Sequence, residues 1–139
     1  MANISNYLEE ALLNHMMRGQ AGGTSYNQPG NVYVGLITNT ATDNELESGD
    51  LTNEVTAYDG NRKEIIFTEP VQIDGKATIT NIGNIDFENM PAETIKYAII
   101  CDNNTGGNIL YWCPALQIKT TNEGDTYRIP DGDLTIDLD

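Results

Sequence analysis

The periodicity of apolar residues changes once along this chain, and the change constrains the fold more than any other feature. Near the N-terminus, apolar side chains recur at the helical spacing of four residues: Ile4, Leu8, Leu12 and Met16. From residue 31 onward, short runs of alternating or continuous apolar residues are separated by turn residues, with turns about every 8–12 positions. One helix followed only by strands is typical of an antiparallel sandwich or barrel. We therefore predict a mainly β protein, an antiparallel, jelly-roll-like β-sandwich with one N-terminal amphipathic α-helix.

The length of the chain, 139 residues, suits a single domain. We predict that residues 1–139 form this domain, with the N-terminal helix in residues 1–20 and the β-sandwich in residues 31–139. A chain of this size buries about two-thirds of the surface that its unfolded form exposes. Folding is therefore expected to require neither a metal ion nor a disulfide.

The N-terminal segment carries signals for both ends of its helix. Ser5 is a suitable N-cap, because its side-chain oxygen can accept a hydrogen bond from the first turn. Gly19 follows the helical pattern and is a typical C-terminal stop. A short helix with an apolar stripe is marginal by itself, so we expect the stripe to pack on the sheet or on a partner chain.

The strands are predicted from alternation and from the turn residues that bound them. Residues 40–53 are polar and acidic, so we predict a long exposed loop there, and Pro114 predicts a bulge or a sheet edge. The predicted strands are 32–37, 53–60, 63–70, 76–81, 85–87, 94–101, 108–113, 126–130 and 133–139, with a turn at Asp74-Gly75 before the fourth.

The net charge excludes two classes of partner. Seven Lys and Arg stand against 21 Asp and Glu, which gives a formal charge of −14. Nucleic-acid binding depends on clustered Lys and Arg, and anionic lipid surfaces also attract basic segments, so we expect neither nucleic acid nor membrane as a partner. The N-terminus lacks the basic and apolar regions of a secretory signal, and no segment approaches the ~20 apolar residues of a membrane span.

Only a few residues carry reactive groups. Cys101 and Cys113 lie in apolar runs and are expected to be buried thiols, with a hairpin disulfide as the alternative. His15 is the only histidine, which argues against a zinc site. We predict no catalytic residues, no cofactor and no metal site. A carboxylate-based hydrolase using Asp102, Asp131 or Asp133 is a further alternative, and an incidental calcium or magnesium site stays open.

Two neighbouring aromatic residues suggest a contact surface. Tyr111 and Trp112 are adjacent on a predicted strand, so their side chains are expected to point to opposite faces of the sheet. One of them is expected in the core. The other is either exposed, where it would bind a partner or a sugar ring, or covered by a loop.

Segments from both ends of the chain resemble a family of small tailed-bacteriophage virion proteins. They are ANISNYLEEALLNHMMRG, NVYVGLITN, KYAIICDNNTGGNILYWCPAL and KTTNEGDTYRIPDGDLTIDLD. Members are often labelled tail-fibre or virion structural proteins and commonly carry a Tyr-Ala-Arg stretch in the middle. Here only Ala57-Tyr58 and Arg62 correspond to that stretch. The resemblance implies a non-enzymatic virion protein, assembled in the cytoplasm of the bacterial host.

The resemblance and the acidic surface together favour a small capsid decoration or cement protein that buries surface between capsid subunits. The alternative is a tail-fibre or baseplate-associated module that binds a host glycan or a fibre partner. The expected partners are other virion proteins, either the major capsid protein or tail components, and a homo-oligomer is expected. The predicted partner contacts are Ile4, Leu8, Leu12, Met16, Tyr111 and Trp112.

Overall fold

The computed structural model describes residues 2–139, apart from the side chain of Leu116. The chain is mainly β, with antiparallel sheets and one N-terminal helix, which confirms the predicted fold class. The helices are α1 (Asn6–Met17), α2 (Asp43–Glu47) and a 3₁₀ turn, η1 (Gly19–Ala21). The strands are β1 (Asn3–Ile4), β2 (Val32–Thr38), β3 (Glu54–Val55), β4 (Lys63–Ile65), β5 (Val71–Ile73), β6 (Lys76–Thr80), β7 (Ile85–Met90), β8 (Thr94–Cys101), β9 (Ile109–Thr120), β10 (Asp125–Ile129) and β11 (Thr135–Leu138).

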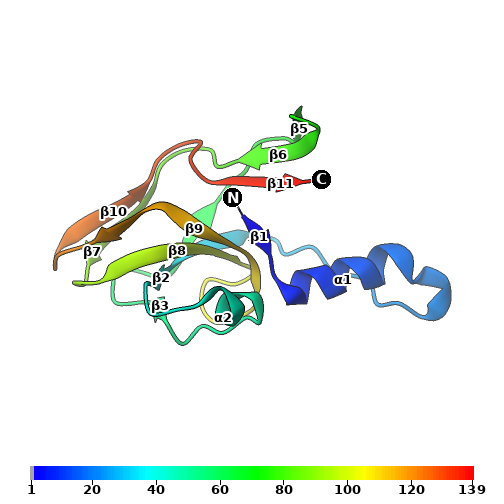
Figure 1. Ribbon diagram of the computed structural model, residues 1–139, viewed down its shortest axis with the longest axis horizontal. Coiled ribbons are helices and arrows are strands. Elements are labelled where there is room, and N and C mark those ends of the chain that lie inside the picture. The colour runs from blue at the N-terminus through cyan, green and yellow to red at the C-terminus, as the bar shows by residue number, and fades with distance from the viewer. Residues whose placement is uncertain (1) are drawn as a thin grey trace.

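The largest sheet forms the centre of the molecule (Figure 1). Its strands follow the order β1-β9-β8-β2-β3, and β4 pairs with β2 beside β3. The register places Val34 opposite Ile100 and Ala98 opposite Cys113. Central strands read as apolar runs because both faces of this sheet are covered.

Two hydrophobic cores lie on the two faces of the large sheet. The first core joins that sheet to β7 and β11 and includes Val34, Ile100, Phe87, Met90 and Ile136. The second core includes Ile37, Leu46, Tyr97, Ile99 and Trp112. A sandwich-like arrangement results, with the smaller sheets β10-β7 and β11-β6-β5 beside the first core.

The predicted long exposed loop at residues 40–53 is wrong, because a short helix, α2, lies there. Thr42 caps α2 by accepting a hydrogen bond from the backbone N–H of Glu45, and the Glu45 carboxylate accepts one from the N–H of Thr42. This capping box stabilises a helix of only five residues. Leu46 is fully buried in the second core, so α2 covers the sheet instead of extending into solvent.

Several local predictions are confirmed and others are too long. Asp74 and Gly75 both have positive φ, at 51° and 79°, in the tight turn that joins β5 to β6. The predicted bulge near Pro114 is present: Tyr97 pairs with Pro114 and Ile95 pairs with Lys119, so four residues of β9 lie opposite one residue of β8. The strands predicted at 53–60 and 63–70 shorten to Glu54–Val55 and Lys63–Ile65.

The two cysteines are free, buried thiols, as predicted. Cys101 packs in the second core and Cys113 in the first, so they lie on opposite faces of the sheet. Burial raises the pKa of the Cys101 thiol to about 12 and that of the Cys113 thiol to about 11. Both groups are therefore protonated and unreactive at neutral pH.

Candidate interaction site

Helix α1 is anchored to the large sheet at its N-terminal end. The Ser5 backbone N–H donates to the carbonyl oxygen of Leu110 at 2.9 Å, and the Ser5 hydroxyl donates to the carbonyl of Ile109. The same hydroxyl oxygen accepts from the N–H of Leu8 at 3.3 Å, so Ser5 is the N-cap, as predicted. Figure 1 shows that α1 then extends away from the β body.

The predicted apolar stripe divides into a covered part and an exposed part. Ile4 lies in β1, before the helix, and is half-buried. Leu8 is buried and Leu12 is half-buried, whereas Met16 is 66% exposed. Leu13 and Met17, which were not among the predicted contacts, are 62% and 76% exposed. Leu13, Met16 and Met17 are called the apolar tip of α1 below.

Tyr111 and Trp112 point to opposite faces of the sheet, as predicted. Trp112 packs in the second core, with its ring 6.0 Å from that of Tyr97, and its indole N–H donates to the Glu47 carboxylate. Tyr111 is half-buried against the first core. Both rings therefore contribute to packing within the chain, and their contact with a partner remains a prediction.

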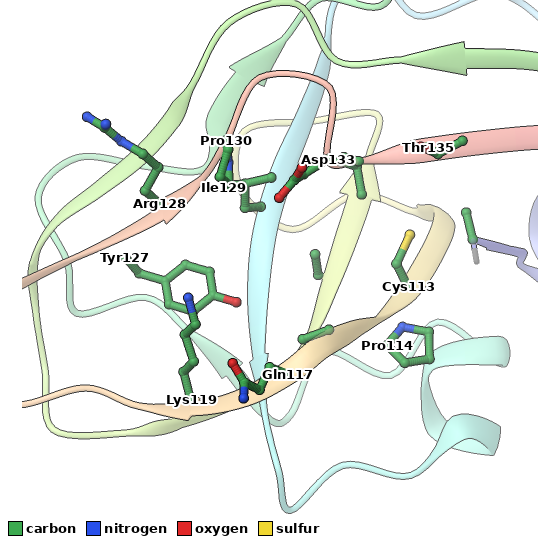
Figure 2. Close-up of a pocket in the computed structure, with 14 residues that line it drawn as sticks. Cys113, Pro114, Gln117, Lys119, Tyr127, Arg128, Ile129, Pro130, Asp133 and Thr135 are labelled. Atoms are coloured by element: carbon green, nitrogen blue, oxygen red, sulfur yellow. The ribbon is translucent and has the colours of Figure 1, made fainter.

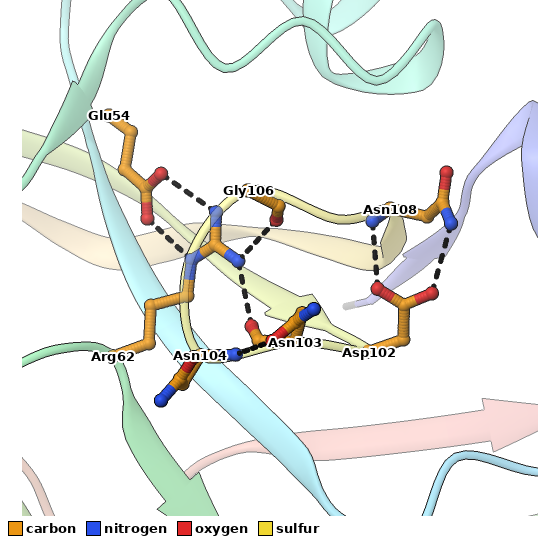
Figure 3. A network of polar contacts seen from close by, with 7 residues as sticks. All are labelled: Glu54, Arg62, Asp102, Asn103, Asn104, Gly106 and Asn108. Carbon is orange, nitrogen blue, oxygen red and sulfur yellow. Dashed lines mark hydrogen bonds and ion pairs between the residues drawn. The ribbon is translucent and has the colours of Figure 1, made fainter.

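A buried ion pair fixes the turn at residues 102–108 (Figure 3). The Arg62 guanidinium makes two hydrogen bonds to the Glu54 carboxylate, at 2.6 and 2.8 Å, and both side chains are less than 10% exposed. The guanidinium also donates to the backbone carbonyls of Asn103 and Gly106, at 2.8 and 2.6 Å. Asp102 accepts from the Asn108 N–H at 2.8 Å and from its side-chain amide. No local sequence pattern indicates that Arg62 binds this turn.

The ion pair also changes the electrostatics of a neighbouring aromatic group. Burial and the nearby Glu54 carboxylate raise the pKa of the Tyr58 phenol to about 12. The Tyr58 ring packs edge-on against Phe87 in the first core, with the ring centres 5.0 Å apart. Tyr58 and Arg62 thus connect the first core to the turn at 102–108, and both side chains contribute to packing within the chain.

A groove of about 520 Å³ lies between β9 and the segment that runs from β10 to β11 (Figure 2), and we call it the β9–β10 groove. Its lining combines small apolar residues with polar groups. The lining residues are Ala2, Ala98, Cys113, Pro114, Ala115, Gln117, Lys119, Tyr127, Arg128, Ile129, Pro130, Asp133, Leu134 and Thr135. Arg128 points away from the groove and binds Asp86 at 2.7 Å. Lys119 therefore supplies the positive charge at the groove.

The residues considered for catalysis have separate structural roles. Asp102 stabilises the turn described above, Asp131 accepts from the Gly83 N–H at 2.6 Å, and Asp133 lies at the β9–β10 groove. His15 is exposed, and its Nδ1 accepts from the Tyr26 N–H at 3.1 Å. Within residues 2–139, no three His, Cys, Asp or Glu side chains are grouped so that they would hold a metal ion. Asp102 and Asp131 thus bind backbone N–H groups of the turns in which they lie or which they contact.

One comparison with known proteins identifies a family. A family described as "Podophage GP4 fiber I protein gp80" has a model that matches residues 3–137. The chain belongs to this gp80 family. The predicted relation to tailed-phage virion proteins is therefore confirmed. No curated protein sequence matches the chain.

The gp80 match covers nearly all of the candidate site. Residues 3–137 contain α1, both ends of β9, the Arg62 network and all but one residue of the β9–β10 groove lining, Ala2. The family supports a structural role in a phage particle. In the described part of the chain, no helix is long and apolar enough to span a membrane.

Proposed function

We propose that this chain is a non-catalytic subunit of a phage fibre and that it functions by packing against neighbouring virion proteins. One observation carries the proposal. The apolar tip of α1 extends from the β body with side chains 62%, 66% and 76% exposed, in a member of a family described as a fibre protein. A group of exposed apolar side chains is typical of a protein–protein contact.

The rest of the structure suits a rigid support for this contact. Two cores cover both faces of the large sheet, and the Arg62 network fixes the turn beside it. Ser5, which is 1% exposed, fixes the direction in which α1 leaves the sheet. The tip is therefore presented at a defined position, as a repeating assembly requires.

A protein partner is favoured over a host glycan. The glycan function rests on Tyr111, Trp112 and the acidic residues 40–53, and both aromatic rings pack within the chain. The partner contacts proposed here are instead Leu12 and Met16 from the predicted set, together with Leu13 and Met17. Leu12 is half-buried and borders the apolar tip.

Capsid decoration is the second candidate function. The net charge of −14 favours it, because an acidic surface suits a protein on the outside of a DNA-filled shell. A decoration protein would use the same apolar tip to bury surface between capsid subunits. The two functions place the chain at different sites of the particle and in different copy numbers.

Immunogold labelling of purified particles, combined with quantitative mass spectrometry, tests both functions. We expect label on the fibres and a copy number that follows the number of fibre subunits. Label spread over the capsid, with a copy number that follows the capsid subunits, would favour decoration. Particles that lack the protein would contradict both candidates, and particles from a phage without the gene provide the control for antibody specificity.

A further inference from the structure

Helix α1 leads away from strand β9, whereas the β9–β10 groove follows that strand toward β10. The helix begins at Ser5, which is bound to Ile109 and Leu110, and the groove is lined by Ala2 and by β9 residues from Cys113 to Lys119. The apolar tip follows Ser5 by 8 to 12 residues, so at 1.5 Å per residue it lies roughly 12–18 Å along the helix from this anchor. Figure 1 shows α1 extending away from the β body on the side remote from β10. The apolar tip therefore cannot reach the groove of its own chain.

On the basis of the fibre role proposed above, we propose that the apolar tip of α1 docks in the β9–β10 groove of a second copy of this chain. Such a contact joins two different surfaces, so each copy keeps one free helix and one free groove. A contact of this kind repeats head to tail and gives a ring or an open filament. An open filament of this kind is one arrangement that suits an extended fibre.

The exposed face of α1 has a composition that suits the groove. At 100° per residue, Glu9 and Glu10 lie on the same face as the apolar tip, and Leu8 lies on the opposite side against the sheet. Both glutamates are exposed, and α1 contains no Lys or Arg. The helix therefore presents three apolar side chains together with two negative charges.

The groove offers the complementary surface. Its lining includes two small side chains, Ala98 and Ala115, and the apolar surface of Tyr127 and Leu134. The groove has a volume of about 520 Å³, which is enough to hold side chains from one face of a helix. The helix itself is about 10–12 Å wide. Unbranched methionines such as Met16 and Met17 adapt well to a pocket of irregular shape.

Charge selects this contact among those available to two copies. Each copy carries −14, so most contacts between two copies bring acidic surfaces together. At the groove, Lys119 would meet Glu9 and Glu10, while Asp133 is the one acidic residue of the lining. Opposite charges at the rim of an apolar contact favour the correct partner and orientation.

Sedimentation velocity of the full chain, over a range of concentrations, tests the proposal. We expect wild type to self-associate. A helix variant (Met16→Glu with Met17→Glu) and a groove variant (Gln117→Glu with Lys119→Glu) should each be monomeric. When the two variants are mixed, an intact helix meets an intact groove, and a 1:1 complex should form without larger species. All four positions are exposed, so the variants should fold.

Two further variants provide controls. Val71→Glu with Ile73→Glu adds the same charge as the helix variant, but on β5, at residues 54% and 50% exposed, and should leave self-association unchanged. Glu9→Lys with Glu10→Lys should restore binding to the groove variant. If the helix variant loses its circular-dichroism signal, Met16→Gln with Met17→Gln replaces it.

Three results would overturn the proposal: a wild-type chain that stays monomeric, mixed variants that form no complex, or a β5 variant that abolishes association. Labelling of fibres in particles is unaffected by any of these results. Failure of this contact is therefore distinguishable from failure of the proposed fibre role.

Discussion

The backbone N–H of Ser5 lies 2.9 Å from the carbonyl oxygen of Leu110, and this hydrogen bond joins the start of α1 to β9. The Ser5 hydroxyl caps the helix and also donates to Ile109. One buried side chain thus sets both the beginning and the direction of the helix that carries the apolar tip. The position of the tip depends on this residue.

Ser5→Ala should therefore loosen α1 more than it destabilises the β body. Loss of an N-cap costs about 1–2 kcal/mol, and the buried carbonyl of Ile109 also loses a donor. We expect faster amide hydrogen exchange across α1, with exchange in β8 little changed. Ser25→Ala, at an exposed position, is the matched control. Equal exchange rates in α1 of wild type and Ser5→Ala would contradict this role.

Arg62→Met should be strongly destabilising, because it leaves the buried Glu54 carboxylate without its partner. Breaking a buried ion pair in this way costs about 3–5 kcal/mol. Urea denaturation measures the change in the free energy of unfolding. Adding Glu54→Gln should recover part of the loss, since it removes the uncompensated charge.

The exposed pair of Arg128 and Asp86 provides the comparison for Arg62. Arg128 also makes two hydrogen bonds to the Asp86 carboxylate, at 2.7 and 3.0 Å, but the Arg128 side chain is 55% exposed. Arg128→Met should therefore leave the free energy of unfolding nearly unchanged. If Arg62→Met and Arg128→Met lowered the free energy of unfolding equally, burial would not determine how much the Arg62 ion pair contributes to stability.

Alkaline pH should destabilise the fold through the buried thiols. An unfolded thiol loses its proton near pH 9, whereas Cys101 and Cys113 in the fold have pKa values of about 12 and about 11. Above pH 9 the unfolded state binds fewer protons, so the free energy of unfolding falls as pH rises toward these folded values. At about pH 10 the two thiols together should lower the free energy of unfolding by about 3 kcal/mol.

Urea denaturation at pH 8 and about pH 10, under reducing conditions, measures this effect. A Cys101→Ala, Cys113→Ala variant should show a smaller decline. The decline that remains is due to tyrosines whose pKa burial also raises, such as Tyr58, with a pKa of about 12. A decline of the same size in both proteins would exclude the thiols as its cause.

Leu46→Ala tests the part of the chain where sequence and structure differ most. Leu46 is the buried residue of α2, and removing a buried leucine side chain costs about 2–5 kcal/mol. Leu13→Ala removes the same atoms from a residue 62% exposed and should cost much less. If the two variants unfold at equal urea concentrations, α2 does not cover the second core.

The helix and the central strands were predictable because each follows a local pattern. Ser5 begins α1, and residues 94–101 form one long apolar run that becomes β8. The burial of Leu46 was not predicted, because its immediate neighbours in the sequence are acidic residues. The Thr42-to-Glu45 spacing was the signal that would have revealed α2, since it is the spacing of a capping box.

The candidate site was only partly predictable, because it depends on contacts between distant segments. The stripe from Leu8 to Met16 predicted a contact face, but the pattern is the same where the sheet covers it and where it is exposed. The β9–β10 groove is formed by residues more than a hundred positions apart, such as Ala2 and Tyr127. Periodicity identifies faces, and only the topology shows which faces lie together.

A cryo-electron reconstruction of the phage particle tests the central claim most directly, because it locates the chain and its neighbours together. The account predicts density for this fold within a fibre, with the apolar tip of α1 covered by an adjacent protein subunit. Density for the fold on the capsid surface, or in a fibre with Leu13, Met16 and Met17 facing solvent, would contradict it.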